Sequence, residues 1–485
     1  MIGPGQEPMN SLTMHPSMTA ASVAAQRQQA LAAMRPQLAA QARLRAQAAA
    51  SSRLAWTFFI ALNGMIIMRP MEIIPSLANL PLYELNILLC LATAMPAIFN
   101  LMRSRFLSFP VNLCAVGMFF AILASTLSKG DFVDAQEQGT EFLKVLIYFV
   151  LLLALVDSPA RIRQLLAWIV IFAFVLNVVA LLSYHHAIDL DTVRPLRELQ
   201  YQASRHAKPV FVERLQAAGI YGNPNDLSRI IVVALTICLY FLVWEKKPER
   251  RVLWGGMMVV FIYALQLTAS RGGLLALIAG VVVLLNARFG MKKGAFLLLL
   301  LVPALAIFGG RQTDITTNTG TGQLRVKLWS EGLVLLRNSP IFGIGAGRYF
   351  HAAGNHAHNS FIEAYVETGF FGGTLFTTAF FLATAALFKF KSQILNFRSP
   401  DLANLRPYIL SLVIGTIVSQ FSSSREYSLP TYMILGIAAA YLAQTDKAVP
   451  NVLPRVSPAL VVKMMFVSAI TLTLAHVYTM FNAHF

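Results

Sequence analysis

The sequence is poor in charge and in cysteine. Only 13% of its 485 residues are charged and 56% are hydrophobic, with a mean hydropathy of +0.61, whereas soluble domains carry about 25% charged residues. This composition excludes an ordinary soluble domain and predicts an all-α, polytopic integral membrane protein. The cysteines, Cys90, Cys114 and Cys238, lie singly in apolar runs. Their placement argues against a disulfide framework or a metal site, and we expect neither a metal nor another cofactor.

Acidic residues are scarce, because 22 Asp and Glu stand against 39 Lys and Arg, a formal net charge of +17. In a soluble protein this excess suggests nucleic acid, but in a membrane protein it is typical of basic cytoplasmic loops. We therefore expect membrane lipids, and no nucleic acid, among the partners. Residues 1–53 contain one acid, Glu7, and no apolar core of a signal peptide. They are interpreted as a disordered or loosely helical cytoplasmic tail, with a membrane-surface or partner-binding segment as the alternative.

Long apolar runs, in contrast, are abundant. A membrane-spanning helix needs about 20 apolar residues. About thirteen candidate runs begin near residues 54, 83, 109, 142, 164, 228, 253, 272, 294, 370, 405, 428 and 458. Six short loops at one set of ends are rich in Lys and Arg, whereas the loop with Asp131, Asp134 and Glu137 lies at the opposite end. By the positive-inside rule, the basic ends are cytoplasmic.

This topology, with about 12–13 transmembrane helices, divides the chain into six parts. They are a basic Ala/Gln-rich cytoplasmic tail (1–53), N-terminal transmembrane helices (54–183), a periplasmic loop (184–227), central transmembrane helices (228–309), a candidate catalytic periplasmic loop (310–359) and C-terminal transmembrane helices (360–485). The two long outer loops exceed the usual length of a connection. Both are rich in basic residues, which favours an anionic ligand on the outer face. A surface facing solvent or lipid headgroups is the alternative.

The stretch HAHNS, residues 356–360, ends the second outer loop directly before an apolar run. Ser360 and Glu363 have the spacing of a capping box, which predicts a helix start at this point. The field of a helix N-terminus disfavours imidazolium, so His358 is predicted to be a neutral histidine that can accept a proton. An ordinary polar loop is the alternative. Two histidines without a third ligand at a recognisable spacing do not predict a metal site.

Two further blocks precede this stretch. Gly343, Gly345 and Gly347 alternate in SPIFGIGAGRYF, which fits either a phosphate-binding backbone nest or a plain turn; the GK[ST] of a nucleotide-binding loop is missing. Arg271 lies between apolar runs at the outer end of a tight hairpin, where an arginine is either functional or an interfacial anchor.

The first outer loop ends in ERLQAAGIYGNPNDLSR. Residues 222–225 are typical of a turn, and Asp226 is predicted to be the N-cap of the next span. Arg214 precedes this turn and is expected on the same outer face as Arg271 and His358. Taken singly, Arg214 is a solvated loop residue.

In combination, these blocks resemble the O-antigen ligase and polymerase superfamily. The pattern on which the resemblance rests is His358-Asn359, followed after nine residues by Gly369-Phe-Phe-Gly372. The lead-in QLRVKLWSEGLVLLRNSPIFGIGAGRYF and the SRGG and RLQAAGIYGNPN blocks are also similar to the family, so the resemblance covers roughly residues 210–375. The family is commonly drawn with about twelve spans, so the basic tail and a thirteenth span are departures.

The resemblance implies a metal-independent glycosyltransferase of the bacterial inner membrane. It would move a glycan from undecaprenyl pyrophosphate to an acceptor hydroxyl of a saccharide or lipid core, at the periplasmic face. By the same resemblance, Arg214 and Arg271 would hold the pyrophosphate and His358 would be catalytic. Arg325, His356 and Asn359 complete the expected substrate-binding set.

Three functions remain open from the sequence. A ligase and a polymerase use the same donor and differ in the acceptor, which is another lipid-linked repeat unit for a polymerase of O-antigen or exopolysaccharide. A lipid-linked oligosaccharide flippase or transporter is the third, and it would favour charged residues or broken helices at mid-membrane. The predicted spans show little of either feature, and Lys144, near the end of a span, is the clearest exception.

Overall fold

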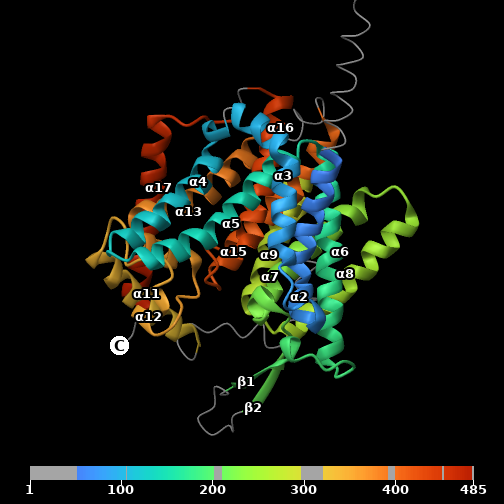
Figure 1. Ribbon diagram of the computed structural model, residues 1–485, viewed down its shortest axis with the longest axis horizontal. Helices are drawn as coiled ribbons and strands as arrows, with labels where there is room; N and C mark the ends of the chain where they lie inside the picture. The colour runs from blue at the N-terminus through green and yellow to red at the C-terminus, as the bar shows by residue number, and fades with distance from the viewer. Residues whose placement is uncertain are drawn as a thin grey trace, which may run out of the picture. The chain divides into compact units, whose positions relative to one another are not determined.

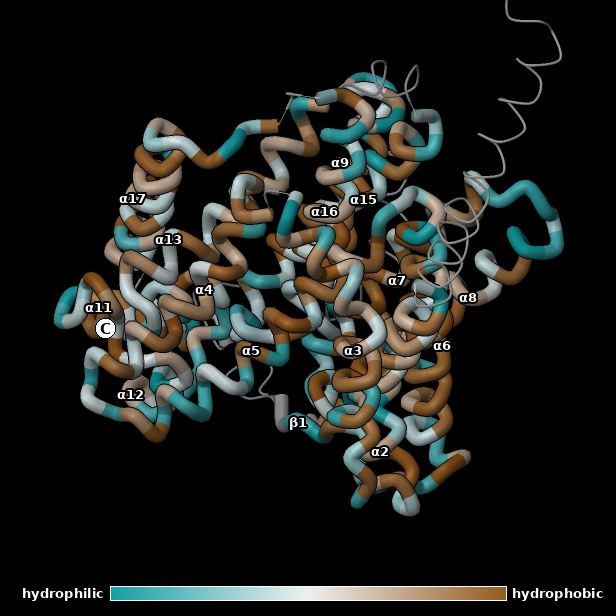
Figure 2. The backbone as a smooth tube through the Cα atoms, turned by 45° about the horizontal axis from the view of Figure 1, so that its top comes forward, coloured by the Kyte–Doolittle hydropathy of each residue, from teal (hydrophilic) through white to brown (hydrophobic). Residues whose placement is uncertain are grey.

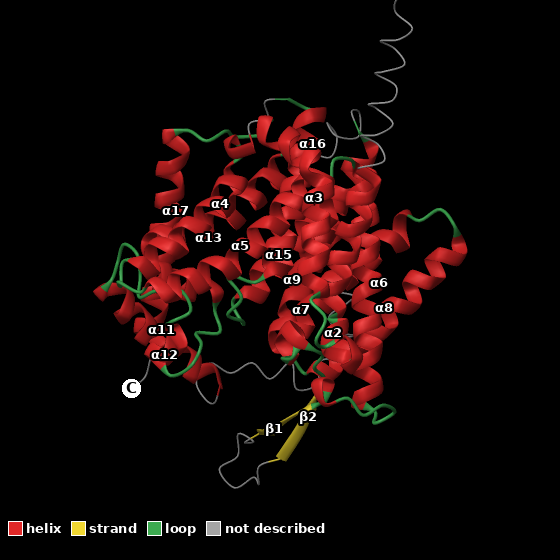
Figure 3. Ribbon diagram, in the orientation of Figure 1, coloured by secondary structure: helices red, strands yellow, loops and turns green. Residues whose placement is uncertain are grey.

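The computed structural model describes residues 52–104, 106–200, 210–295, 321–390, 399–450 and 453–482. The chain divides into two compact units, Met1–Leu54 and Ala55–Phe485, and the account below concerns the second. Helices make up nearly all of this unit, as Figure 1 and Figure 3 show, with one small two-stranded sheet among the described residues. Ten helices in the described part of the chain are long and apolar enough to cross a membrane. The protein is therefore an all-α, multi-pass membrane protein, as predicted.

The ten candidate spans correspond to ten of the expected runs. They are α3 (Leu82–Arg103), α4 (Pro110–Leu127), α5 (Phe132–Leu155), α6 (Pro159–Tyr184), α7 (Pro224–Trp244), α8 (Pro248–Thr268), α9 (Arg271–Phe289), α13 (Ser360–Lys389), α15 (Pro400–Gln420) and α17 (Pro458–Asn482). The run near residue 54 forms a shorter apolar helix, Ser52–Met68, and the run near 428 forms α16 (Leu429–Ala448). The run near 294 lies mainly outside the described residues.

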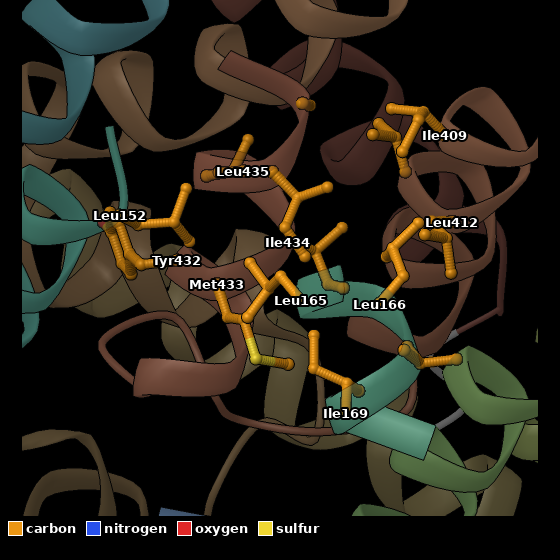
Figure 4. Packing of buried hydrophobic residues seen from close by; sticks show 14 of the residues in the cluster. Leu152, Leu165, Leu166, Ile169, Ile409, Leu412, Tyr432, Met433, Ile434 and Leu435 are labelled. Atoms are coloured by element: carbon orange, nitrogen blue, oxygen red, sulfur yellow. The ribbon is translucent and has the colours of Figure 1, made fainter. Parts of the chain in front are cut away.

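The core is formed where α16 is enclosed by other helices. Buried side chains of α16, including Met433 and Ile434, pack beside Leu165 and Ile169 of α6 (Figure 4). Most residues of α7 and α15 are buried as well, whereas α17 is largely exposed. Exposed apolar helix surface is what lipid covers in a membrane. Figure 2, in which the backbone is coloured by hydropathy, shows hydrophobic residues along the helices of the bundle. The buried helices α7, α15 and α16 therefore position the loops at their ends.

Contacts between helix ends show which loops share a side. At the ends carrying the basic loops, Arg163 pairs with Asp401 at 2.8 Å and Gln444 donates to the carbonyl of Val156 at 2.9 Å. At the opposite ends, Arg348 pairs with Asp131 and Asp134. The two long outer segments lie at these opposite ends, the lower end of the view in Figure 1.

Both long segments contain regular structure that the sequence did not predict. In the first, β1 (Leu196–Gln200) pairs antiparallel with β2 (Val210–Arg214), and Leu196 lies opposite Arg214. The second contains α11 (Thr321–Asn338) and the short α12 (Tyr349–Ala353). Short elements α2 (Pro70–Ile73), η1 (Pro75–Leu77), η2 (Phe106–Ser108), η3 (Asp191–Val193) and η4 (Gly219–Tyr221) complete the connections.

Candidate functional site

The start of α13 positions the histidine stretch. Asn359 is the N-cap, because its side-chain oxygen accepts hydrogen bonds from the backbone N–H groups of Phe361 and Ile362 at 3.1 and 3.3 Å. The predicted capping box at Ser360 is therefore wrong by one residue. Ser360 is fully buried inside the helix start, and its hydroxyl lies 2.7 Å from the carbonyl of Ser423 and accepts from the backbone N–H of Arg425 at 2.8 Å. The short Asn side chain reaches the free N–H groups, while the serine joins α13 to the loop after α15.

Glu363 stabilises the histidine stretch from inside the helix. Its buried carboxylate lies 2.8 Å from Nδ1 of His356 and accepts from the backbone N–H of Ala357 at 3.1 Å and from the hydroxyl of Ser424. The hydrogen bond from Glu363 raises the pKa of His356. Glu363 favours the protonated form of His356, and the contact between them favours a role in orienting the loop.

His358 lies in a different environment from His356. Its backbone is left-handed, with φ 49°, and its N–H donates to the hydroxyl of Ser424 at 3.0 Å. Burial, followed by the positive charges of Arg325 and His356, lowers the pKa of His358 to about 4. Its imidazole has no hydrogen-bond partner within the described part of the chain. A neutral, half-buried imidazole with a free ring nitrogen is able to accept a proton at neutral pH.

Arg325, whose charge acts on His358, and the neighbouring Arg271 have no partner among the described residues. Arg271 is the first residue of α9, after a turn in which Ala269 is left-handed and Ser270 is the N-cap. Arg325 lies on α11, and its pKa is lowered by burial and by the charges of Arg271 and Arg214. Neither Arg271 nor Arg325 forms a hydrogen bond or ion pair with a described residue. Like charges held together without partners are what an anionic ligand would neutralise.

Arg214 is close to this pair, but its guanidinium is already engaged. It donates to the carbonyl of Thr268 at 2.9 Å, to Glu198 at 2.9 Å and to the side-chain oxygen of Asn225 at 3.2 Å. Asn225 also accepts from Ser270 at 2.9 Å. The arginine thus connects the sheet to the turns that carry the SRGG and GNPN blocks. Its assignment to the pyrophosphate stays a prediction, and its contacts favour positioning.

The glycines of SRGG allow helices to approach closely. A Cβ on Gly272 would lie 2.0 Å from Oγ of Ser422, and one on Gly273 would lie 2.5 Å from Oγ of Ser228. Larger residues at either position would push α9 away from α7 and from the end of α15. Glycine here serves to bring Arg271 beside the loop that carries Ser424.

Asp226 is not the N-cap of α7, contrary to the sequence-based prediction. Asn223 is the cap, since its side chain accepts from the N–H of Asn225 at 2.8 Å, and Pro224 begins the helix. Asp226 lies in the first turn and pairs with Arg425 at 2.5 Å. Asn223 caps the first N–H groups of the helix, so the carboxylate of Asp226 is not needed as a cap and instead binds an arginine from a distant loop.

The alternating glycines form a nest whose occupant belongs to the protein. Gly343, Gly345 and Gly347 all have positive φ, at 75°, 110° and 76°. The N–H groups of Gly347 and Tyr349 donate to the two carboxylate oxygens of Glu367, both at 2.9 Å. The nest is therefore filled by a side chain of α13, and the phosphate interpretation of these glycines is wrong.

The nest reaches α13 at a break in that helix. Gly369 has φ 68° and ψ −169°, and the N–H of Phe370 donates to the carbonyl of Pro340 at 2.8 Å. A Cβ on Gly369 would lie 2.2 Å from the carbonyl oxygen of Ile341. Glycine is required at this point of the motif, because its backbone conformation and the close approach both exclude a side chain.

Sequence reasoning assigned Glu363 to a capping box and missed its role as a buried acid beside His356, and it missed Glu367 and the loop cation Arg425 altogether. Glu363 and Glu367 are four residues apart in an apolar run, and each is only 2% exposed. Buried carboxylates in a candidate span are costly unless they are paired or hydrogen-bonded, so their presence was the available signal. Arg425 pairs with Asp226 from a position 199 residues away, which no local pattern indicates.

Replacing Glu367 should destabilise the protein. Glu367→Ala leaves the N–H groups of Gly347 and Tyr349 without their acceptors, which costs about 1–3 kcal/mol for each buried unsatisfied group. We expect a clear fall in the midpoint of thermal unfolding in nanodiscs. Glu331→Ala on the exposed face of α11 is the matched control. An unchanged midpoint for Glu367→Ala would show that the nest does not depend on this carboxylate.

These features define a multi-pass membrane protein with clustered arginines and a neutral histidine at one end of its helix bundle. Residues 256–377 match the family model described as O-antigen ligase, which confirms the resemblance to the O-antigen ligase superfamily. Members of this family are membrane glycosyltransferase-like enzymes, namely ligases and polymerases, and the family implies lipid-linked glycan substrates. The matched stretch contains Arg271, Arg325 and His358, whereas Arg214 lies outside it. No curated protein matches the chain.

Proposed function

We propose that the protein transfers a glycan from undecaprenyl pyrophosphate to an acceptor hydroxyl at the periplasmic face of the bacterial inner membrane. The observation that carries this proposal is that the charge of Arg325 acts both on the neutral imidazole of His358 and on Arg271, while neither guanidinium group forms a hydrogen bond or ion pair with a described residue. Guanidinium forks match phosphate oxygens and remain charged at any physiological pH. The imidazole supplies the second requirement of the reaction, a group that removes the acceptor proton.

In the proposed reaction, the acceptor oxygen attacks the anomeric carbon of the donor glycan. The new bond joins that oxygen to the anomeric carbon, and the bond between the anomeric carbon and the phosphate oxygen breaks. Undecaprenyl pyrophosphate leaves with the electron pair, and His358 takes the acceptor proton. Arg271 and Arg325 stabilise the negative charge that develops on the leaving pyrophosphate. Asn359 and His356 keep the loop in place through the helix cap and the Glu363 pair.

The same site would serve a polymerase, because only the acceptor differs. We keep the ligase as the proposed function, since the histidine motif is accompanied by both the SRGG and the GNPN block, and these blocks meet at Asn225 and Ser270. A flippase would favour charged residues or a broken helix within a span. The span α13 has both, but Glu363 and Glu367 are already bound by groups of the protein, which disfavours their use by a transported substrate.

The reaction is proposed to be metal-independent, with fixed arginine charge at the leaving group. Purified protein should transfer a defined undecaprenyl-pyrophosphate glycan to an acceptor equally well with and without EDTA. An O-antigen-free lipopolysaccharide core and a second lipid-linked glycan are the two acceptors to compare. Transfer to the core supports a ligase, and elongation of the lipid-linked glycan supports a polymerase. Loss of transfer with EDTA, restored by added divalent cation, would contradict the metal-independent mechanism.

The proposed orientation is testable by chemical labelling. Single cysteines should be introduced at Asp191, in the first outer segment, and at Glu249, in the first turn of α8 next to the basic loop; both positions are exposed, and the native cysteines are buried. In cells with a permeabilised outer membrane, an impermeant maleimide should label Asp191→Cys but not Glu249→Cys. The reverse pattern would place the candidate site in the cytoplasm.

A further inference from the structure

A cavity that none of the proposed site residues lines lies beside residues 427–430, which follow the loop that contains Ser424. Its volume is about 620 Å³, and it is enclosed by the helix Ser52–Met68, the starts of α3 and α5, and residues 427–430. None of Arg214, Arg271, Arg325 or His358 lines it. The cavity is therefore separate from the cation cluster, by which we mean Arg214, Arg271 and Arg325. The function proposed above does not yet use this cavity.

The lining of this cavity differs in charge from the cation cluster. Arg69 lies 3.4 Å from Glu72, and Lys144 pairs with Glu141 at 2.7 Å. Both cations therefore have acidic partners, whereas Arg271 and Arg325 have none among the described residues. A balanced set of charges offers little to a pyrophosphate, but its carboxylates and cations remain able to accept from and donate to hydroxyl groups.

The remaining lining groups suit an uncharged saccharide. The side chains of Asn79 and Gln138 offer amide donors and acceptors, and the half-buried ring of Tyr83 offers a flat apolar surface. Pockets that bind small molecules typically combine such apolar walls with a few polar groups that fix orientation. A sugar ring has the matching surface, with hydroxyl groups at its rim and C–H groups on its faces.

The loop between α15 and α16 connects this cavity to the catalytic histidine. Ser424 accepts the backbone N–H of His358, while Tyr427 and Pro430, a few residues further on, line the cavity. Ile220, beside the turn that precedes α7, lines it as well. The wall of the cavity is thus made of the same segments that hold the proposed site.

We propose that this cavity binds the saccharide part of the acceptor and is the acceptor subsite of the enzyme. The inference rests on the proposed glycan transfer and adds to it the chemical class that the second subsite takes, an uncharged polyol on a membrane-bound carrier. The exposed apolar side chains of α3, such as Leu85 and Leu88, border the same end of that helix. A lipid anchor on the acceptor would remain against this surface while its sugar enters the cavity.

The kinetic test separates the two substrates. Tyr83→Ala and Gln138→Ala should each raise KM for the acceptor by about 10-fold, the effect of losing about 1.4 kcal/mol of binding. The KM for the undecaprenyl-pyrophosphate glycan should change less than about twofold. Asp191→Asn, whose exposed side chain does not line the cavity, is the control and should change neither value. A rise in the donor KM alone would overturn the acceptor assignment.

A binding test decides the question without turnover. In nanodiscs, octyl maltoside below its micellar concentration should slow maleimide labelling of Asn79→Cys, while octylphosphocholine at the same concentration should not. Equal protection by both would mean that the cavity takes an alkyl chain, and protection by neither would mean that it binds no saccharide; either result overturns the inference.

The two proposals fail in distinguishable ways. If the unmodified protein is active, His358→Ala is inactive and the cavity variants keep their acceptor KM, the acceptor subsite is wrong and the transfer reaction stands. If the unmodified protein transfers to neither acceptor, the transfer reaction is wrong, and the labelling result alone decides whether the cavity binds a saccharide.

Discussion

His358→Ala should lower glycan transfer by about 10²–10⁴-fold, the usual contribution of a positioned general base. The donor should still bind, because Arg271 and Arg325 remain in place and the hydrogen bond that His358 makes to a described residue comes from its backbone N–H. Single-turnover transfer and binding of radiolabelled donor, measured on the same nanodisc preparation, separate these effects. If His358→Ala loses donor binding and keeps its rate at saturating donor, the residue binds phosphate and the general-base role is wrong.

The pH dependence gives an independent test of the same residue. A base must be neutral, and the pKa of His358 in the free protein is about 4. The value of kcat/KM should therefore be flat near neutral pH and fall as the pH drops through about 4. The pyrophosphate charge of the bound donor favours imidazolium, so the acidic fall in kcat should occur at higher pH than the fall in kcat/KM. A phosphate clamp made of imidazolium would show the opposite trend and gain activity on acidification.

His356→Ala should have a milder effect than His358→Ala. Its side chain pairs with Glu363, and its loss removes a contact that orients the loop without removing the proposed base. The backbone contacts from Ala357 to Glu363 and from His358 to Ser424 remain. Equal losses for the two histidine variants would show that the loop, and not the single imidazole, limits the reaction.

Arg271→Ala should reduce transfer by about 10²–10³-fold, the typical cost of removing one group that stabilises a developing negative charge. The transfer rate of Arg271→Lys should also fall sharply, because an ammonium group keeps the charge but lacks the planar guanidinium fork that binds two phosphate oxygens. Neither variant should lower the midpoint of thermal unfolding, since Arg271 makes no hydrogen bond or ion pair with the described residues. Turnover, donor affinity and thermal unfolding should be measured together.

The control for this arginine is Arg197→Ala. Arg197 pairs with Glu213 on the outer sheet, and its side chain is 70% exposed. Its loss should leave turnover within about twofold, because an exposed ion pair contributes little. Normal turnover and normal donor affinity in Arg271→Lys would remove Arg271 from the site. Equal losses in Arg197→Ala would instead indicate a general effect of positive charge on this face.

The sequence by itself determined the membrane class of the protein and most of its spans. Hydropathy reports on about 20 consecutive residues, and ten expected runs correspond to ten long apolar helices. Two residues of the candidate site, Arg271 and His358, could also be selected from the sequence, because they stand at the ends of apolar runs, where charged residues and glycines are easy to recognise. Local patterns were less accurate at helix starts. Ser360 and Asp226 both looked like caps, and in each case an asparagine one to three residues earlier is the cap.

Only the tertiary structure decided which polar groups are available to a substrate. Arg214, Arg271 and Arg325 are equivalent as sequence features, yet Arg214 donates to three acceptors of the protein while the other two have no described partner. The glycine nest is equally suited to a phosphate until Glu367 fills it. The physical reason is that these partners are far apart in the chain and are brought together by helix packing. A local pattern shows which group is charged, but the packed structure determines what has already neutralised it.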